Sequence, residues 1–195
     1  GEMRLLDLGC GLRKQQNAIG IDMNANAHPD VIGNIEQGLP FRDKSFDKVV
    51  GYSVLEHLSN LDGCVREVGR VLRRGGIFEV FVPHFSNALF YSDPTHKRCF
   101  GYFTFDYYCD ESLQKSRWKV PAFYNRDIRL EILEKSFVFS SRFKYMAKAS
   151  RLIERWANRS EEWKLFYETH LCWLFPCYGI RYLITFRDPS SPERP

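Results

Sequence analysis

The first 83 residues alternate short apolar runs with turn residues. Five of the runs have the length of buried strands. They cover residues 4–8, 18–22, 31–33, 46–52 and 77–83. Apolar residues at near-helical spacing between Leu61 and Leu72 predict one helix, and the sequence Arg-Arg-Gly-Gly that follows is expected to end it. Strands that alternate with helical segments indicate a parallel sheet joined by right-handed crossovers.

The first two connections in this pattern are unusually short. Nine residues, 9–17, separate the first two strands, and eight residues, 23–30, separate the next pair. A helical crossover usually needs about 10–12 residues. We therefore expect both flanking helices to be reduced to a turn or a loop.

The pattern loosens after Pro83. Short helical pieces are expected around residues 87–91, 104–109 and 111–118. The remaining predicted elements are a strand from 128 to about 139, helical residues 147–173 with a break near Asn158–Ser160, and a last strand over 182–187. The tail, residues 188–195, contains three prolines and is expected to be frayed.

The composition is that of an ordinary globular domain. Hydrophobic residues make up 44% and charged residues 27% of the 195 positions, which excludes a disordered or fibrous chain. No apolar run approaches the roughly 18 residues of a membrane span, and no signal-peptide pattern is present. The six cysteines include no Cys-x-x-Cys pair, so we expect reduced thiols in a cytoplasmic protein and no metal site.

Charge and aromatic residues are distributed unevenly along the chain. Residues 1–82 have a net charge of −1 and five aromatic residues, whereas residues 83–195 have a net charge of +5 and twenty-five. Two interpretations remain open. The second part uses its aromatic residues for packing, or it forms an aromatic, mildly basic lid over a substrate.

The most informative stretch is the sequence LDLGCG at residues 6–11. A strand that ends in Gly-x-Gly lets the backbone turn tightly and approach a ligand, and the carboxyl end of the first strand lines the ligand crevice of a parallel sheet. Asp22 ends the second strand, where it can accept hydrogen bonds from a ribose diol. A dinucleotide fingerprint fits poorly, because Lys14 replaces the third glycine and Asp22 follows Gly11 by only 11 residues. This spacing disfavours a nicotinamide-dependent oxidoreductase.

The sequence resembles the class I, Rossmann-like S-adenosylmethionine-dependent methyltransferases, in a compact branch. The resemblance covers about residues 4–83 and rests on linked motifs in their usual order. They are LDLGCG at 6–11, IGID at 19–22, GLPF at 38–41 with SFD at 45–47, SVLEHL at 53–58, and the stretch from Arg66 to Gly76. The resemblance implies an α/β fold with a doubly wound, mostly parallel sheet, shortened first helices and an aromatic-rich insertion before an antiparallel last pair of strands.

The family's cofactor residues carry over to particular positions. Gly9, Cys10 and Gly11 are expected to bring backbone against the methionine part of S-adenosylmethionine, in a loop held by Asp7. Asp22 is expected to bind the ribose hydroxyls. The other implied contacts are Met23 on the adenine, Asn34 and Ile35 where the family usually has an acid near the adenine amino group, and Tyr52 and Ser53 near the methyl group. The family's N-terminal helix over the cofactor has no counterpart here, so we expect weakened cofactor binding.

Methyl transfer needs no conspicuous catalytic dyad, because orienting the reactants can supply about 7–11 kcal/mol. An oxygen or nitrogen acceptor can still need a base, for which histidine is suited. The candidates are His84, after the fifth strand, then His57 and His96. His57 has a structural alternative in helix packing or capping, and His96 has one in an exposed, charged turn. The aromatic residues 100–108 either line a substrate pocket or belong to the core.

These observations favour one domain over residues 1–187. It consists of a cofactor-binding half at 1–82, a substrate or lid insertion at 83–127, and last strands with covering helices at 128–187. The predicted function is methyl transfer from S-adenosylmethionine to a small or medium-sized acceptor. The alternative is a non-catalytic S-adenosylmethionine-binding module that acts through a partner. A net charge of +4 without a basic stripe argues against nucleic acid, and residues 144–159 leave peripheral membrane contact as a minor alternative.

Overall fold

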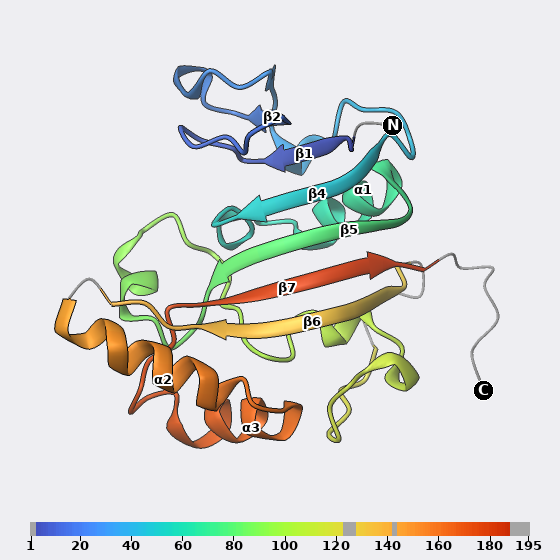
Figure 1. Cartoon of the computed structure of the whole chain (residues 1–195). Helices are drawn as coiled ribbons and strands as arrows, with labels where there is room; N and C mark the ends of the chain where they lie inside the picture. The colour runs from blue at the N-terminus through green and yellow to red at the C-terminus, as the bar shows by residue number, and fades with distance from the viewer. Residues whose placement is uncertain (1–2, 123–127, 142–143, 188–195) are drawn as a thin grey trace.

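The computed structural model describes residues 3–122, 128–141 and 144–187, so the tail and the end of the insertion lie outside the described residues. Its centre is a seven-stranded sheet with the order β3-β2-β1-β4-β5-β7-β6 (Figure 1). The strands are β1 (Leu5–Leu8), β2 (Ala18–Asp22), β3 (Val31–Ile32), β4 (Phe46–Tyr52), β5 (Leu72–Pro83), β6 (Leu130–Val138) and β7 (Gly179–Phe186). The first five pair in parallel, and β7 runs antiparallel to both of its neighbours. This confirms the predicted fold class.

The described helices are few and short. They are α1 (Leu61–Val71), α2 (Ala147–Ala157) and α3 (Glu161–Phe166), which continues into a π-helical turn, Tyr167–Leu171. As the chain spacing predicts, turns alone connect β1 to β2, and one 3-10 turn, η1 (Ala25–Ala27), lies between β2 and β3. The predicted break before α3 is present, since residues 158–160 are not helical. The Ser160 hydroxyl caps α3 by accepting a hydrogen bond from the Trp163 amide at 3.2 Å.

Three predicted boundaries are wrong. The helix that begins at Leu61 ends at Val71, and the Arg-Arg-Gly-Gly segment belongs to an irregular start of β5, where the register against β4 shifts. Helix expected over 111–118 is only the turn η6 (Glu111–Leu113). The last strand begins at Gly179 and not at Tyr182. In the first and third cases pairing with a neighbouring strand extends the element, which single-sequence patterns do not record.

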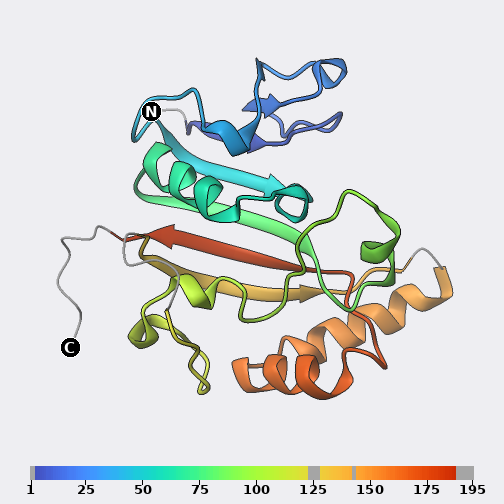
Figure 2. The ribbon, with the colours of Figure 1, turned by 180° about the vertical axis from the view of Figure 1, so that it is seen from behind.

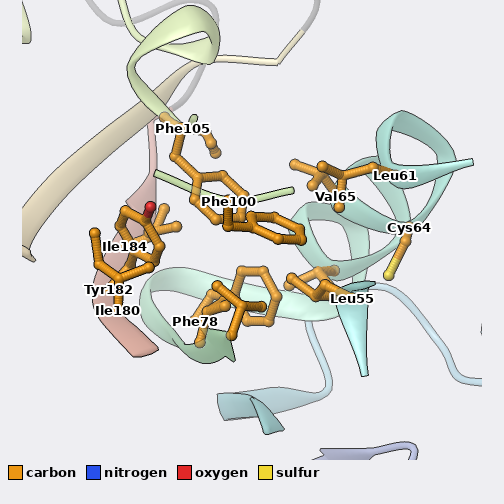
Figure 3. Close-up of a cluster of buried hydrophobic side chains, with 14 of the residues drawn as sticks. Leu55, Leu61, Cys64, Val65, Phe78, Phe100, Phe105, Ile180, Tyr182 and Ile184 are labelled. Carbon is orange, nitrogen blue, oxygen red and sulfur yellow. The ribbon is translucent and has the colours of Figure 1, made fainter. Parts of the chain in front are cut away.

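The two faces of the sheet differ in cover. We call one the covered face; the apolar side chains that β5 and β7 place on it are almost completely buried, and α1 and the insertion lie over it (Figure 2). Figure 3 shows this core, in which Phe78 of β5 lies among Leu55, Val65 and Phe100. Tyr182 and Ile184 of β7 extend the same cluster and are fully buried. Contacts between distant segments therefore build most of the core.

We call the opposite face, toward the viewer in Figure 1, the open face. The β4, β5 and β7 registers place Lys48, Glu79, Tyr52 and Arg181 on it. Glu79 accepts from Lys48 Nζ at 2.6 Å and from Arg181 Nε at 2.9 Å. These charges satisfy one another on a partly solvated sheet surface, and α1 lies behind the sheet.

Side chains from the end of α2 and from Asn158, the residue that caps it, close the outer edge of the sheet. The Asn158 carboxamide accepts from the Phe137 amide at 2.8 Å and donates to the Phe137 carbonyl at 2.7 Å. Glu154 accepts from the Phe139 amide at 2.8 Å. These bonds occupy backbone groups that an unpaired edge strand would present to another chain.

Candidate active site

The carboxyl ends of β1, β2 and β4 meet at one edge of the sheet, because the three strands are parallel neighbours. Gly9 and Gly11 follow β1 with φ angles of +56° and +50°, in the left-handed region that favours glycine. A Cβ on Gly9 would lie 2.4 Å from Val54 Cγ2, so only glycine fits there. Glycine therefore lets the backbone of this turn pass directly against Val54 at the carboxyl end of β1.

Two carboxylates hold this glycine loop. Asp7 Oδ2 accepts from the Gln15 amide at 2.7 Å, which ties the far end of the loop to β1. Asp22 Oδ2 accepts from the Gly11 amide at 2.8 Å, and its Oδ1 accepts from the Asn24 amide at 2.8 Å. Each carboxylate oxygen has a second acceptor site, so Asp22 can bind the loop and still receive two hydroxyl groups. Burial raises the pKa of Asp7, and the Gln15 amide opposes that shift.

The residues expected to contact the adenine differ in how accessible their side chains are to a ligand. Met23 is 72% exposed beside Asp22. Asn34 Oδ1 already accepts from the Glu36 amide at 3.0 Å, as the cap of the turn η2 (Ile35–Gln37). The Ile35 side chain is buried in the core, so only its backbone can meet a ligand. Cys10 is also buried, and it too can offer only backbone.

Tyr52 ends β4 at the same edge, and Ser53 follows it directly. The Tyr52 hydroxyl hydrogen-bonds Glu79 on the open face, and burial together with this carboxylate raises the pKa of Tyr52 to about 12. Ser53 is exposed and has a φ of +52°, which is uncommon for a residue other than glycine. Its amide donates to the Phe81 carbonyl at 2.8 Å, which helps hold this strained backbone.

His84 is not placed as the sequence predicts. Its side chain is fully buried. Nδ1 accepts from the Ser86 amide at 3.1 Å, and Nε2 lies 3.0 Å from Glu168 Oε2. Both ring nitrogens are occupied, so His84 presents no free nitrogen to an acceptor. It joins the end of β5 to the π-helical turn as a structural residue.

His57 and His96, in contrast, lie together, with ring centroids 4.8 Å apart. Their cluster includes Glu56, a residue that the sequence analysis did not single out. Glu56 is a charged residue in the turn that follows β4, between Leu55 and His57, yet its side chain is only 1% exposed. Its one signal in the sequence is its place within the SVLEHL motif, which does not reveal burial.

The aromatic segment 100–108 is mostly core. Phe100, Tyr102 and Phe105 are essentially inaccessible, which favours the packing interpretation over a pocket wall. A cavity of about 540 Å³ does lie between the insertion and α3, lined in part by Phe103 and Trp118. It is separated from the crevice, because α3 and β1 lie at opposite ends of the sheet (Figure 1).

Comparisons with known proteins agree with this geometry. The pattern of a methyltransferase domain family matches residues 6–80. The chain is 39% identical over 87 residues to uncharacterized protein MJ1252 of Methanocaldococcus jannaschii, which covers 38% of this chain and 34% of that protein. It is 26% identical over 157 residues to a sterol 24-C-methyltransferase of Yarrowia lipolytica, covering 68% and 38%. The chain thus spans about a third of the length of the curated relatives it matches.

Solved structures share the fold. A SAM-dependent methyltransferase from Archaeoglobus fulgidus superposes with a TM-score of 0.54 at 18% identity, over 96% of this chain and 87% of that one. The cyclase SpnF superposes with a TM-score of 0.51 at 21% identity, over 98% and 77%. No described helix is long and apolar enough to cross a membrane. The glycine turn and the acid after β2 both lie within residues 6–80, the part of this chain that matches the methyltransferase domain family.

Proposed function

We propose that this chain transfers a methyl group from S-adenosylmethionine to a small or medium-sized acceptor. One observation carries the proposal: Asp22 lies at the end of β2 with its carboxylate on the Gly11 amide. The same acid therefore holds the glycine turn and would receive the ribose hydroxyls of the cofactor. Gly9 supports it, because a Cβ would close the backbone cradle beside Val54.

In the proposed reaction the chain mainly binds and orients. The backbone of Gly9 and Gly11 would hold the methionine part of the cofactor, and Asp22 would bind its ribose hydroxyls. The bound cofactor supplies a methyl group on a sulfonium, which is already a good leaving group. Ser53, at the exposed end of β4, would lie on the acceptor side. Orientation of this kind can supply much of the required rate enhancement.

A non-catalytic binding module is the second candidate. It is favoured by the position of His84, which is buried and paired and therefore is not available as a base. The likeness to SpnF adds that this fold also occurs in a protein named for another reaction. Both candidates require binding of the cofactor, and they differ only in turnover.

Cofactor binding is tested by thermal unfolding with S-adenosylhomocysteine and, separately, with NAD. We expect stabilisation by the first and not by the second. Asp22→Ala should remove the stabilisation, while Asp110→Asn, which changes a partly exposed carboxylate in the insertion, should keep it. Stabilisation by NAD, or an unchanged response of Asp22→Ala, would contradict the proposal.

Turnover separates the enzyme from the binding module. The full chain is incubated with S-adenosylmethionine carrying a labelled methyl group and with panels of metabolites, sterols and protein acceptors. Sterols are included because a sterol 24-C-methyltransferase is a relative. Transfer that depends on Asp22 supports the enzyme. Binding of S-adenosylhomocysteine without transfer to any class favours the module.

A further inference from the structure

Three potential ligands meet beside the end of β4. Glu56 and His57 belong to the turn η3 (Leu55–His57), and His96 comes from the loop that follows β5. One ligand atom of each lies within 4.8 Å of those of the other two. The two segments are joined by backbone, since the Lys97 and Arg98 amides donate to the Glu56 carbonyl at 2.7 and 3.2 Å.

The hydrogen bonds of the two rings decide which nitrogens remain available. His96 Nδ1 lies 2.8 Å from the Phe90 carbonyl, which can only accept, so this nitrogen carries a proton. Thr95 donates its hydroxyl proton to Asp93 Oδ1 at 2.6 Å and therefore accepts from His57 Nδ1 at 2.9 Å. In both neutral rings the lone pair is then on Nε2. A metal-bound histidine has the same arrangement, with its other nitrogen donating to an oxygen.

Glu56 adds a third hydrogen-bond acceptor to the two imidazole nitrogens. Its side chain is 1% exposed, and Oε2 has no hydrogen-bond partner among the described residues. Burial, with a smaller effect of nearby Asp93, raises the pKa of Glu56 to about 7. A buried acceptor without a donor is costly. Two imidazole lone pairs and an unpartnered carboxylate oxygen are groups that a bound cation would satisfy.

We propose that Glu56, His57 and His96 form a site for a divalent transition-metal ion of the zinc type. Two nitrogens and one carboxylate oxygen match the three-ligand sites that leave one position open for another molecule. Magnesium and calcium prefer sites made only of oxygen ligands. Bonds of about 2.0–2.1 Å place tetrahedral ligands roughly 3.4 Å apart, so the side chains close by about 1–1.5 Å on binding.

The site adjoins the candidate cofactor loop. Val54, whose side chain lies over Gly9, precedes Glu56 by two residues. Asp93 Oδ2 lies 3.6 Å from His96 Nε2 and adds negative charge beside the three proposed ligands. If the proposed methyl transfer is correct, this location gives the ion a role: its open coordination position binds an oxygen of the methyl acceptor. Metal binding itself does not depend on that function.

The test uses the full chain after removal of metal with a chelator. Zn²⁺ binding is measured by calorimetry, and Co²⁺ binding by the visible absorption that tetrahedral coordination produces. We expect about one equivalent of each ion and no binding of Mg²⁺ at the same concentrations. Thr95→Val, which removes the partner of His57, should weaken Zn²⁺ binding by about 10–100-fold.

Ligand variants decide the outcome. Glu56→Gln and, separately, His57→Ala should abolish stoichiometric binding, whereas His28→Asn, at an exposed histidine with φ +52°, should leave it unchanged. Without metal, Glu56→Gln should unfold at the same or a higher temperature than the parent, because it removes an unpartnered buried carboxylate. If Glu56→Gln does not fold, His57→Ala decides alone.

Two results overturn the metal site: absence of stoichiometric Zn²⁺ binding to the parent chain, or full binding by the folded ligand variants. Equal affinity for Mg²⁺ would overturn its assignment to the zinc type. The outcome is separable from the methyltransferase proposal, because stabilisation by S-adenosylhomocysteine is measured without metal and metal binding is measured without cofactor.

Discussion

The insertion is anchored to the sheet by a buried ion pair whose removal gives a measurable prediction. Lys135 of β6 lies on the covered face, with Nζ 2.8 Å from Asp106 Oδ2. The two side chains are 2% and 1% exposed. Lys135 Nζ also lies 3.5 Å from the centre of the Tyr102 ring and donates to the Tyr102 carbonyl at 3.3 Å. Lys135→Met keeps the length of the side chain and leaves Asp106 without its cation.

Removal of one partner of a fully buried pair costs about 3–5 kcal/mol, because an uncompensated charge remains. For a chain of this size each kcal/mol lowers the melting temperature by about 2–4 °C. We therefore expect Lys135→Met to melt roughly 6–20 °C below the parent. Lys135→Met/Asp106→Asn should recover most of this loss, because it removes both charges. The partly exposed pair of Arg129 and Asp110 is the control, and Arg129→Met should cost less than about 1 kcal/mol.

The same variant should respond to pH. Burial raises the pKa of Asp106 against the opposing attraction of Lys135. A carboxyl group with a raised pKa in the folded state binds its proton more tightly there, so its contribution to stability falls as the pH rises above the unfolded value. Loss of Lys135 raises the pKa further. The destabilisation of Lys135→Met should therefore be smaller at pH 5 than at pH 8.

The assay is urea and thermal unfolding of the parent, both single variants and the double variant, followed by circular dichroism. The cycle measures the coupling between the two residues. A cost for Lys135→Met near that of Arg129→Met would refute the reasoning. Additive losses in the double variant would refute it equally, since they would show that each side chain contributes only its own packing.

Three further predictions concern the crevice and the sheet. Gly9→Ala should abolish stabilisation by S-adenosylhomocysteine, whereas Gly75→Ala, also at positive φ but with open space around it, should only lower stability by about 1–2 kcal/mol; equal ligand responses would contradict the steric argument. Glu79→Gln should lower the Tyr52 pKa from about 12 toward 10, measured as phenolate absorbance against Tyr52→Phe. Because the Tyr52 pKa of the parent is raised in the folded state, the stability of the parent should fall above pH 10. An unchanged Tyr52 pKa in Glu79→Gln would exclude Glu79 as a cause of the shift. Asn158→Ala should lower the free energy of unfolding by about 1–3 kcal/mol and speed hydrogen exchange at Phe137, and unchanged exchange would exclude the edge contact.

Local chemistry allowed the sequence to predict much of the cofactor half. The glycine turn after β1 is readable because only glycine adopts its backbone freely. The loss of the first two helices follows from chain length alone, since 9–17 and 23–30 are too short to hold them. The break at Ser160 is equally local, because a cap and its helix are neighbours in the chain. Only the order of the strands brings Asp22 and Gly11 together, but the family resemblance already places them at one site.

Only the tertiary structure shows which histidines have a ring nitrogen without a hydrogen-bond partner. His84 is paired with Glu168, 84 residues away, so no local pattern could show that both of its nitrogens are occupied. His96 meets Glu56 and His57 across about 40 residues of sequence, through backbone bonds between two loops. Burial and long-range pairing set the chemistry of such groups, and both exist only after the chain has packed. The sequence by itself therefore determined the cofactor edge, and the folded structure determined which side chains beside it have a free lone pair.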